Sequence, residues 1–162
     1  MLSRKDILIN KTKGKQLINE YLNEISSLVK KPISKEDLIS LEDTFIKIEE
    51  TKRNVAAVPV GKTRFHFDDK DKLKNIFSEI NRFYDGGFYL VITYSKYCGA
   101  AYLESLEYFN TDFQFNDEHA GIISLLCETL NAKILLDFYE DASEKLLEVE
   151  TYGVPFESVK LY

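Results

Sequence analysis

The first part of the chain alternates apolar and polar residues with the period of an α-helix. A helix is predicted over about residues 12–30, because apolar residues recur there every three or four positions, namely Leu17, Ile18, Tyr21, Leu22, Ile25, Leu28 and Val29. Pro32 ends this pattern, and Ser34 with Asp37 three positions later is typical of a capping box that opens a second helix. The apolar face of the second helix comprises Leu38, Leu41, Phe45, Ile46 and Ile48. Together the two segments predict an N-terminal helical hairpin.

The middle of the chain changes to the shorter apolar period of β-strands. Residues 55–60 predict a short strand, which Pro59 places at a sheet edge because proline has no backbone N–H to donate. Residues 63–67 alternate in polarity and are expected to continue the sheet. Asp68 is a good N-cap for a third helix, whose apolar face comprises Leu73, Ile76, Phe77, Ile80, Phe83 and Tyr84. A glycine-rich turn then leads into residues 88–94, which are apolar on both faces and predict a central strand.

The remainder of the chain predicts more helix and strand in alternation. Residues 100–109 fit both states. Asn116 is expected to cap a fourth helix, whose apolar face comprises Ile122, Ile123, Leu125, Leu126 and Leu130. Residues 133–139 and 146–152 predict two further strands. We therefore expect a single α+β domain over residues 1–162, in which the helical hairpin precedes a mixed sheet of about four to five strands with interleaved helices.

Charge is distributed unevenly along the chain. Residues 1–84 carry 17 Lys and Arg against 13 Asp and Glu, whereas residues 85–162 carry 4 against 14 and hold 14 of the 21 Phe and Tyr. An acidic surface of this kind repels nucleic acid and anionic membranes, and it attracts a basic protein partner. Because the chain shows no apolar signal segment, we expect a cytoplasmic protein in which Cys98 and Cys127 are reduced.

Several patterns resemble catalytic or cofactor motifs without their usual context. Residues 56–63 fit the loose P-loop template, but they favour extended chain, so we expect a strand followed by a turn at Gly61 and no nucleotide site. A thiol-dependent hydrolase would require a constellation such as Cys98, His119 and Asp137, for which the sequence shows no local signature. Two histidines and two isolated cysteines predict no typical zinc site, and no cofactor is expected.

Acidic and aromatic residues gather in two segments, residues 112–118 and 137–144. These segments flank the predicted fourth helix and the strand after it, and an antiparallel packing of that helix and strand would bring them to one edge of the domain. Tyrosine supplies a large contact surface, and clustered carboxylates steer a basic partner. The predicted partner-binding residues are Tyr102, Glu104, Asp112, Asp117, Glu118, Asp137, Tyr139, Glu140, Asp141 and Glu144.

In its size, its acidic balance and its lack of a catalytic signature, the chain resembles bacterial toxin immunity proteins of the contact-dependent-inhibition and polymorphic-toxin type. The resemblance is to a class of protein, extends over the whole chain and rests on no motif. It implies a protein without catalytic residues that neutralises a basic toxin, such as a nuclease, by stoichiometric binding. Two other functions remain open: a small thiol-dependent hydrolase that uses Cys98 and His119, and a structural or adaptor subunit that oligomerises through its N-terminal helices.

Overall fold

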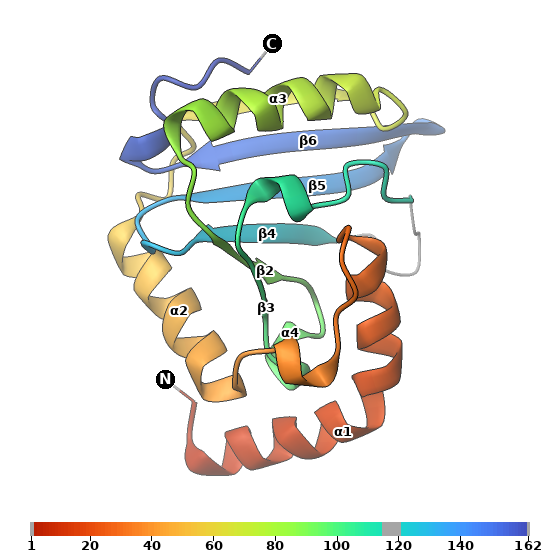
Figure 1. Ribbon diagram of the computed structural model, residues 1–162, viewed down its shortest axis with the longest axis vertical. Coiled ribbons are helices and arrows are strands. Elements are labelled where there is room, and N and C mark those ends of the chain that lie inside the picture. The colour runs from red at the N-terminus through yellow and green to blue at the C-terminus, as the bar shows by residue number, and fades with distance from the viewer. Residues whose placement is uncertain (1, 115–120, 162) are drawn as a thin grey trace.

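A six-stranded sheet forms the centre of the protein (Figure 1). The computed structural model describes residues 2–114 and 121–161. The strands lie in the order β1-β6-β5-β4-β2-β3, and every neighbouring pair is antiparallel. Their bounds are β1 Gly61–His66, β2 Phe88–Val91, β3 Ala101–Leu103, β4 Ile122–Cys127, β5 Lys133–Asp141 and β6 Glu144–Tyr152. The α+β class is confirmed, whereas the expectation of a mixed sheet of four to five strands is wrong.

Helices cover one face of this sheet and part of the other face. Their bounds are α1 Arg4–Ser27, α2 Leu41–Asn54, α3 Lys70–Phe83 and α4 Ser95–Cys98, and single 3-10 turns occur at η1 Lys35–Asp37, η2 Leu106–Tyr108 and η4 Val154–Phe156. Each of the three longer helices begins at a polar cap, because Ser3, Ser40 and Asp69 accept a hydrogen bond from the backbone N–H three residues later. The cap of α3 is thus Asp69, one residue after the predicted one.

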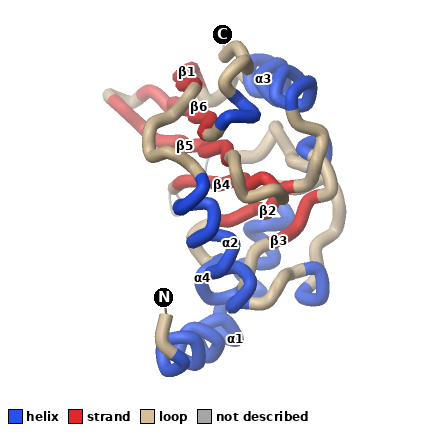
Figure 2. Tube along the Cα trace, turned by 90° about the vertical axis from the view of Figure 1, so that its left-hand side faces the viewer, coloured by secondary structure: helices blue, strands red, loops and turns tan. Residues whose placement is uncertain are grey.

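The two faces of the sheet have different surroundings. One face packs against α3, whose buried residues are Leu73, Ile76, Phe77 and Ile80. Alternate strand residues point toward it and form the core, namely Phe65, Phe88, Leu90, Ile123, Leu125, Ile134, Leu136, Phe138, Leu147 and Val149. Figure 2 shows α3 on one side of β1, β6 and β5, with no helix from the described chain on the other side of these three strands. Burial of the large apolar side chains beneath α3 is the main favourable contribution to folding.

The long helix α1 is anchored to the short helix α4 through the buried side chain of Tyr21. The Tyr21 hydroxyl donates a hydrogen bond to the carbonyl oxygen of Gly99 and lies 3.0 Å from the Ser95 hydroxyl. Burial raises the pKa of Tyr21, so the hydroxyl stays protonated and remains a donor. About two helical turns before Tyr21, Gly14 packs directly against the backbone of Tyr97. The α1–α4 contact therefore combines a buried polar anchor with a close approach of two backbones.

The predicted fourth helix is wrong, because residues 122–127 form strand β4 between β2 and β5. Ile123, Leu125 and Cys127 enter the core, while Ile122 and Ser124 face the other way. A segment of six residues, five of them apolar, fits the period of a strand as well as that of a helix, so its pairing partners decide its structure. The expected cap, Asn116, lies outside the described residues. The predicted strands over 133–139 and 146–152 are confirmed as β5 and β6.

Other boundaries differ from the prediction for local reasons. Helix α1 begins at Arg4, well before the predicted start, because Ser3 and Asp6 form a capping box. The capping box at Ser34 opens only the 3-10 turn η1, and α2 begins later, after its own cap Ser40. The predicted strand over residues 55–60 is wrong, because no strand forms there and pairing starts at Gly61, where a turn was expected. The reason is that β6 ends beside Gly153, whose φ of 101° turns the partner strand away.

The region from residue 88 to 109 follows the predicted pattern in part. Strand β2 lies between β3 and β4, so the expected inner position is confirmed. The strand ends at Val91 and not at residue 94, because Tyr94 already caps α4. The ambiguous residues 100–109 contain both kinds of structure, the short strand β3 and the 3-10 turn η2.

The substitution Gly14→Ala tests the contact between α1 and α4. In an isolated helix, alanine is more favourable than glycine by about 1 kcal/mol. Here the added Cβ would overlap the carbonyl oxygen of Tyr97, so we expect the free energy of unfolding to fall by about 1–3 kcal/mol in urea denaturation. The control Lys15→Ala changes an exposed residue of the same helix and should alter stability by less than about 0.5 kcal/mol. A more stable Gly14→Ala variant would contradict this packing.

Candidate protein-interaction surface

The uncovered face of the sheet gathers charged, aromatic and apolar side chains from four strands. We call this surface the open face, and it consists of Lys62, Arg64 and His66 of β1, Leu146, Glu148 and Glu150 of β6, Leu135, Asp137 and Tyr139 of β5, and Ile122 of β4. Because successive strand residues point to opposite faces, these side chains alternate with those that enter the core. All of them are exposed or half-buried.

The strand register arranges the open face in rows that cross the sheet. The central row is Arg64, Glu148, Asp137 and Ile122. The row on one side is Lys62, Glu150, Leu135 and Ser124, and the row on the other side is His66, Leu146 and Tyr139. Directly opposed residues on antiparallel strands have Cβ atoms about 5 Å apart. Asp137 therefore lies in the middle of the open face, between Glu148 and Ile122.

Negative charge accumulates around Asp137. Lys62 is the one cation that the described chain brings within ion-pair distance of these acids, with its Nζ 2.9 Å from both Glu148 and Glu150. These hydrogen bonds raise the pKa of Lys62. Asp137 has no ion pair among the described residues. Burial raises its pKa, the carboxylates of Glu148 and Glu150 raise it further, and the charge of Lys62 offsets part of the increase.

The carboxylates of Asp137 and Glu148 stand at directly opposed positions of β5 and β6. Like charges at directly opposed positions of an antiparallel pair are destabilising, and the same arrangement recurs at Asp141 and Glu144 where the hairpin ends. Folding requires only that strand residues facing solvent be polar, so that they alternate with the apolar residues of the core. Folding does not require acids at these positions. Repulsion between opposed carboxylates is an energetic cost that brings no improvement in core packing. Costs of this kind are expected at functional surfaces.

Apolar and aromatic side chains lie among these acids. Ile122 is 51% exposed, and Leu135 and Leu146 are half-buried. The Tyr139 hydroxyl accepts a long hydrogen bond of 3.4 Å from Arg64. The open face thus combines charged residues with exposed apolar and aromatic side chains, and aromatic residues are enriched in protein–protein interfaces.

Beyond the open face, the same side of the sheet is covered by α2. The ammonium group of Lys47 in α2 lies 4.6 Å from the ring centre of Tyr89 in β2, which in turn lies 5.4 Å from that of Tyr102 in β3. The Tyr102 hydroxyl donates to the carboxylate of Glu128 at 3.0 Å. Tyr102, a predicted partner-binding residue, therefore contacts Tyr89 and Glu128 within the fold and lies outside the open face.

The structure divides the predicted partner-binding residues among several places. Asp137 and Tyr139 lie on the open face, and Asp141 and Glu144 lie at the adjacent end of the β5–β6 hairpin. Glu140 belongs to the same hairpin but alternates to the other face, opposite Lys145. Asp112 pairs with Lys74 of α3 at 3.4 Å, and Glu104 lies 3.8 Å from Lys31, so neither joins the open face. Asp117 and Glu118 lie outside the described residues.

The predicted packing of a helix against a strand does not produce the acidic surface. Strand β4 occupies that position, and the acids next to Asp137 come from β6, which the sequence argument did not select. The signal was present in residues 146–152, because apolar residues alternate there with Glu148 and Glu150. In a strand this alternation places both glutamates on the face opposite the core.

The residues considered for chemistry occupy other environments. The Cys98 thiol donates to the carbonyl oxygen of Gly14 at 3.7 Å, and burial raises its pKa, which disfavours the reactive thiolate. Cys98 lies between α4 and α1, whereas Asp137 faces outward from β5, so these two members of the suggested triad do not meet; His119 lies outside the described residues. Lys62 of the P-loop-like segment lies within β1 and begins no helix. No group of three or more His, Cys, Asp or Glu within the described ranges is arranged to hold a metal ion.

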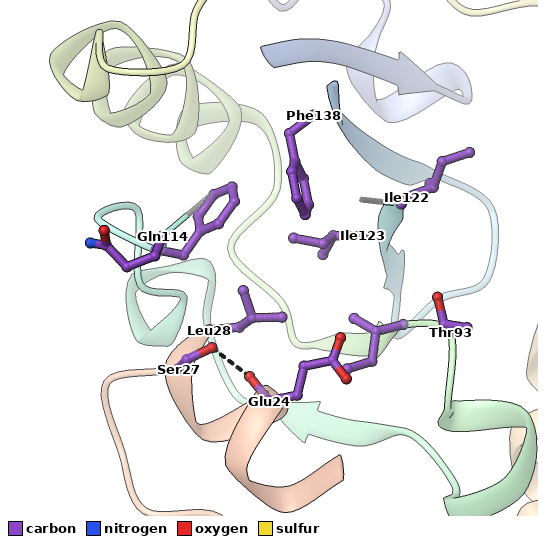
Figure 3. A pocket seen from close by; sticks show the side chains of 11 residues that line it. Glu24, Ser27, Leu28, Thr93, Gln114, Ile122, Ile123 and Phe138 are labelled. Atoms are coloured by element: carbon purple, nitrogen blue, oxygen red, sulfur yellow. Dashed lines mark hydrogen bonds between the residues drawn. The ribbon is translucent and has the colours of Figure 1, made fainter. Parts of the chain in front are cut away.

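A small hollow opens between the end of α1 and the start of β4 (Figure 3). Its walls are mostly apolar and include Leu28, Ile123 and Phe138, while Glu24 and Thr93 contribute polar atoms. The space amounts to about 40 Å³. A hollow of this size holds about one water molecule and is far smaller than a typical ligand pocket.

Comparisons with known protein families, with curated proteins and with solved structures give no match for this chain. Among the described helices, none has the length and apolar character needed to cross a membrane.

The substitution Asp137→Asn tests the electrostatic cost of the open face. The pKa of Asp137 is raised in the folded state, so the folded chain binds this proton more tightly than the unfolded chain does. Ionisation of Asp137 therefore lowers the free energy of unfolding as the pH rises above about 4, the ordinary pKa of an aspartate. We expect Asp137→Asn to increase the free energy of unfolding at pH 7 by a few tenths of a kcal/mol to about 1 kcal/mol.

The gain from Asp137→Asn should disappear below about pH 4, where the carboxyl is neutral in both states. Urea denaturation at pH 7 and pH 3.5 measures the difference, with Asp85→Asn on an exposed turn as the control. A loss of stability at pH 7 would show that Asp137 supports the sheet.

Proposed function

We propose that this chain is a protein-binding module that neutralises a basic toxin, in the manner of a bacterial immunity protein, and that it binds through the open face. The observation that carries the proposal is the opposed pair Asp137 and Glu148 on an uncovered sheet face, with the exposed side chain of Ile122 beside it. A basic partner resolves the electrostatic cost of this pair, because its Lys or Arg side chains supply the missing positive charge.

The fit to a basic partner follows from how the charges on the open face are already paired. Lys62 satisfies Glu148 and Glu150 together, whereas Asp137 lacks a cation of its own among the described residues. An arginine of a partner that approaches Asp137 would also contact Ile122 and Tyr139, so charge pairing and apolar burial occur at the same place. Asp137 is therefore the expected centre of the interface.

The dimensions of the open face support a partner that extends beyond it. The four strands comprise two of six and two of nine residues, which at about 3.3 Å per residue and about 4.8 Å between strands give an area of about 480 Å². A stable interface buries about 800 Å² on each partner. The end of the β5–β6 hairpin, with Asp141 and Glu144, supplies the adjoining surface and adds to the negative charge.

Charge reversal at the centre of the open face tests the proposal. The double variant Asp137→Lys, Glu148→Lys should weaken binding to the cognate toxin by about 2–5 kcal/mol, because two desolvated charge pairs become repulsive contacts. The toxin is obtained as the protein that co-purifies with the chain or that the adjacent gene encodes, and isothermal titration calorimetry measures the affinity after circular dichroism has confirmed the fold.

The matched control is Asp85→Lys, Glu107→Lys, which makes the same change in net charge at two exposed residues outside the open face. We expect this control to change the affinity by less than about 1 kcal/mol, through long-range attraction alone. Equal losses in both double variants would show that only net charge matters, and an unchanged affinity in Asp137→Lys, Glu148→Lys would place the interface elsewhere.

The rate of association provides an independent test. Exposed charges on the open face attract a basic partner over about 10 Å at 0.1 M salt, and added salt screens this attraction. Stopped-flow measurements should show an association rate that falls as ionic strength rises, while the dissociation rate changes less. A rate that stays constant between low and high salt would remove the acidic surface as the source of attraction.

A further inference from the structure

A groove with the opposite charge runs along the outer side of α3. It lies between α3 and the C-terminal segment, which Figure 1 shows side by side at the end of the molecule that carries the C-terminus. The groove has a volume of about 560 Å³, and its polar and aromatic lining includes Lys72, Asn75, Arg82, Phe83, Ser158 and Lys160. A volume of this size is within the range of small-molecule sites.

The fold builds both walls of this groove from elements fixed in the core. On α3, residues 72, 75, 79 and 82 follow a spacing of three and four and therefore form one stripe. The opposite wall is held by Phe156 and Val159, which are buried and leave Ser158 and Lys160 exposed on either side of Val159. The polar groups of the groove are thus presented by anchored backbone on both sides.

The groove is basic although the chain as a whole has a net charge of −6. It brings together Lys72, Arg82 and Lys160 with a single acid, Glu79. Glu79 holds one end of the Arg82 guanidinium through contacts from Nη1 of 3.0 and 3.4 Å, which leaves its other N–H groups available. Lys160 forms no ion pair with any described residue.

An aromatic side chain lies beside these cations. Phe83, the last residue of α3, is 44% exposed and lines the groove together with Ile76. A flat apolar surface next to several cations fits a ligand that carries both an anionic group and an aromatic ring.

We propose that this groove binds a small molecule that carries a phosphate group and a planar ring. Arg82 and Lys160 contact the phosphate oxygens, Asn75 and Ser158 provide uncharged hydrogen-bond donors, and Phe83 packs against the ring. The site belongs to the α3 side of the sheet and is independent of the function proposed for the open face.

The test uses two probes, pyrophosphate and adenosine 5′-monophosphate, titrated to about 10 mM against the full chain at constant ionic strength. Amide chemical shifts measured by NMR should change in a saturable manner at Asn75, Arg82 and Ser158. Sodium chloride at the same ionic strength should not reproduce these changes, because it lacks the geometry of a phosphate group.

Variants identify the contacts. The double variant Arg82→Gln, Lys160→Gln should weaken binding of both probes at least about tenfold, whereas Lys5→Gln, Lys15→Gln, two exposed lysines of α1, should leave it unchanged. Phe83→Ala should weaken adenosine 5′-monophosphate severalfold and leave pyrophosphate unaffected. Thermal unfolding confirms that each variant is folded, and Lys160→Gln alone preserves the Arg82–Glu79 contact if the double variant is unstable.

Each other outcome overturns the proposal. Absence of saturation by both probes at about 10 mM would show that the groove is an ordinary solvated surface. Equal weakening by the α1 control would show non-specific attraction to surface lysines. If Phe83→Ala left the affinity for adenosine 5′-monophosphate unchanged while pyrophosphate still bound, the groove would be an anion site only, and the proposed ring contact would be contradicted.

Discussion

The nine-residue pairing of β5 with β6 is the constraint on which the rest of the structure depends. Both strands are inner strands of the sheet, so β4 and β1 can attach only in a register compatible with theirs. Their two-residue turn places Ala142 and Ser143 at positive φ, as a type I′ turn requires, although neither residue is glycine. A slip of one residue would turn Asp137 and Glu148 toward α3 and expose Leu136 and Val149. The burial of the core therefore holds the acids on the open face.

A second set of contacts joins the helical end of the molecule to this sheet at Gly99 and Ala100. Tyr21 of α1 donates to the Gly99 carbonyl, and Thr44 of α2 accepts the Ala100 N–H at 2.9 Å. The N–H of Ile39, before α2, donates to the Ala100 carbonyl at 3.0 Å. Gly99 permits this convergence because its φ of 92° and its lack of a Cβ allow the Ile39 carbonyl to approach. One short turn thus positions α1, α2, α4 and β3.

The sheet also separates surfaces of opposite charge. Asp137, Glu148 and Glu150 lie on the open face together with Lys62 and Arg64. Lys72 and Arg82 of α3 and Lys160 of the C-terminal segment gather on the other side. Because charges at a protein surface are screened within about 10 Å at 0.1 M salt, each surface attracts ligands with little interference from the other. Such a separation allows one small domain to carry a protein-binding face and an anion-binding groove, and both are proposed on that physical basis.

The elements that the sequence predicted best are those with long local patterns. The third helix has a capping aspartate and an apolar stripe over several turns, and the strands at 133–139 and 146–152 are rich in alternating apolar residues. Residues 122–127 lacked such a pattern. Their apolar residues fit the period of an α-helix as well as that of a β-strand, and only pairing with β2 and β5 on either side selects the strand.

By itself, the sequence determined the α+β class, the excess of acids and aromatics after residue 84, and the choice of Asp137 and Tyr139 as candidate residues, because composition and short-range periodicity are properties of the chain alone. The tertiary structure decided which acids meet. It placed Glu148 opposite Asp137 and drew Asp112 to Lys74 on α3. Neighbours across a sheet are set by register and by the packing of distant segments, which the local pattern of residues does not encode.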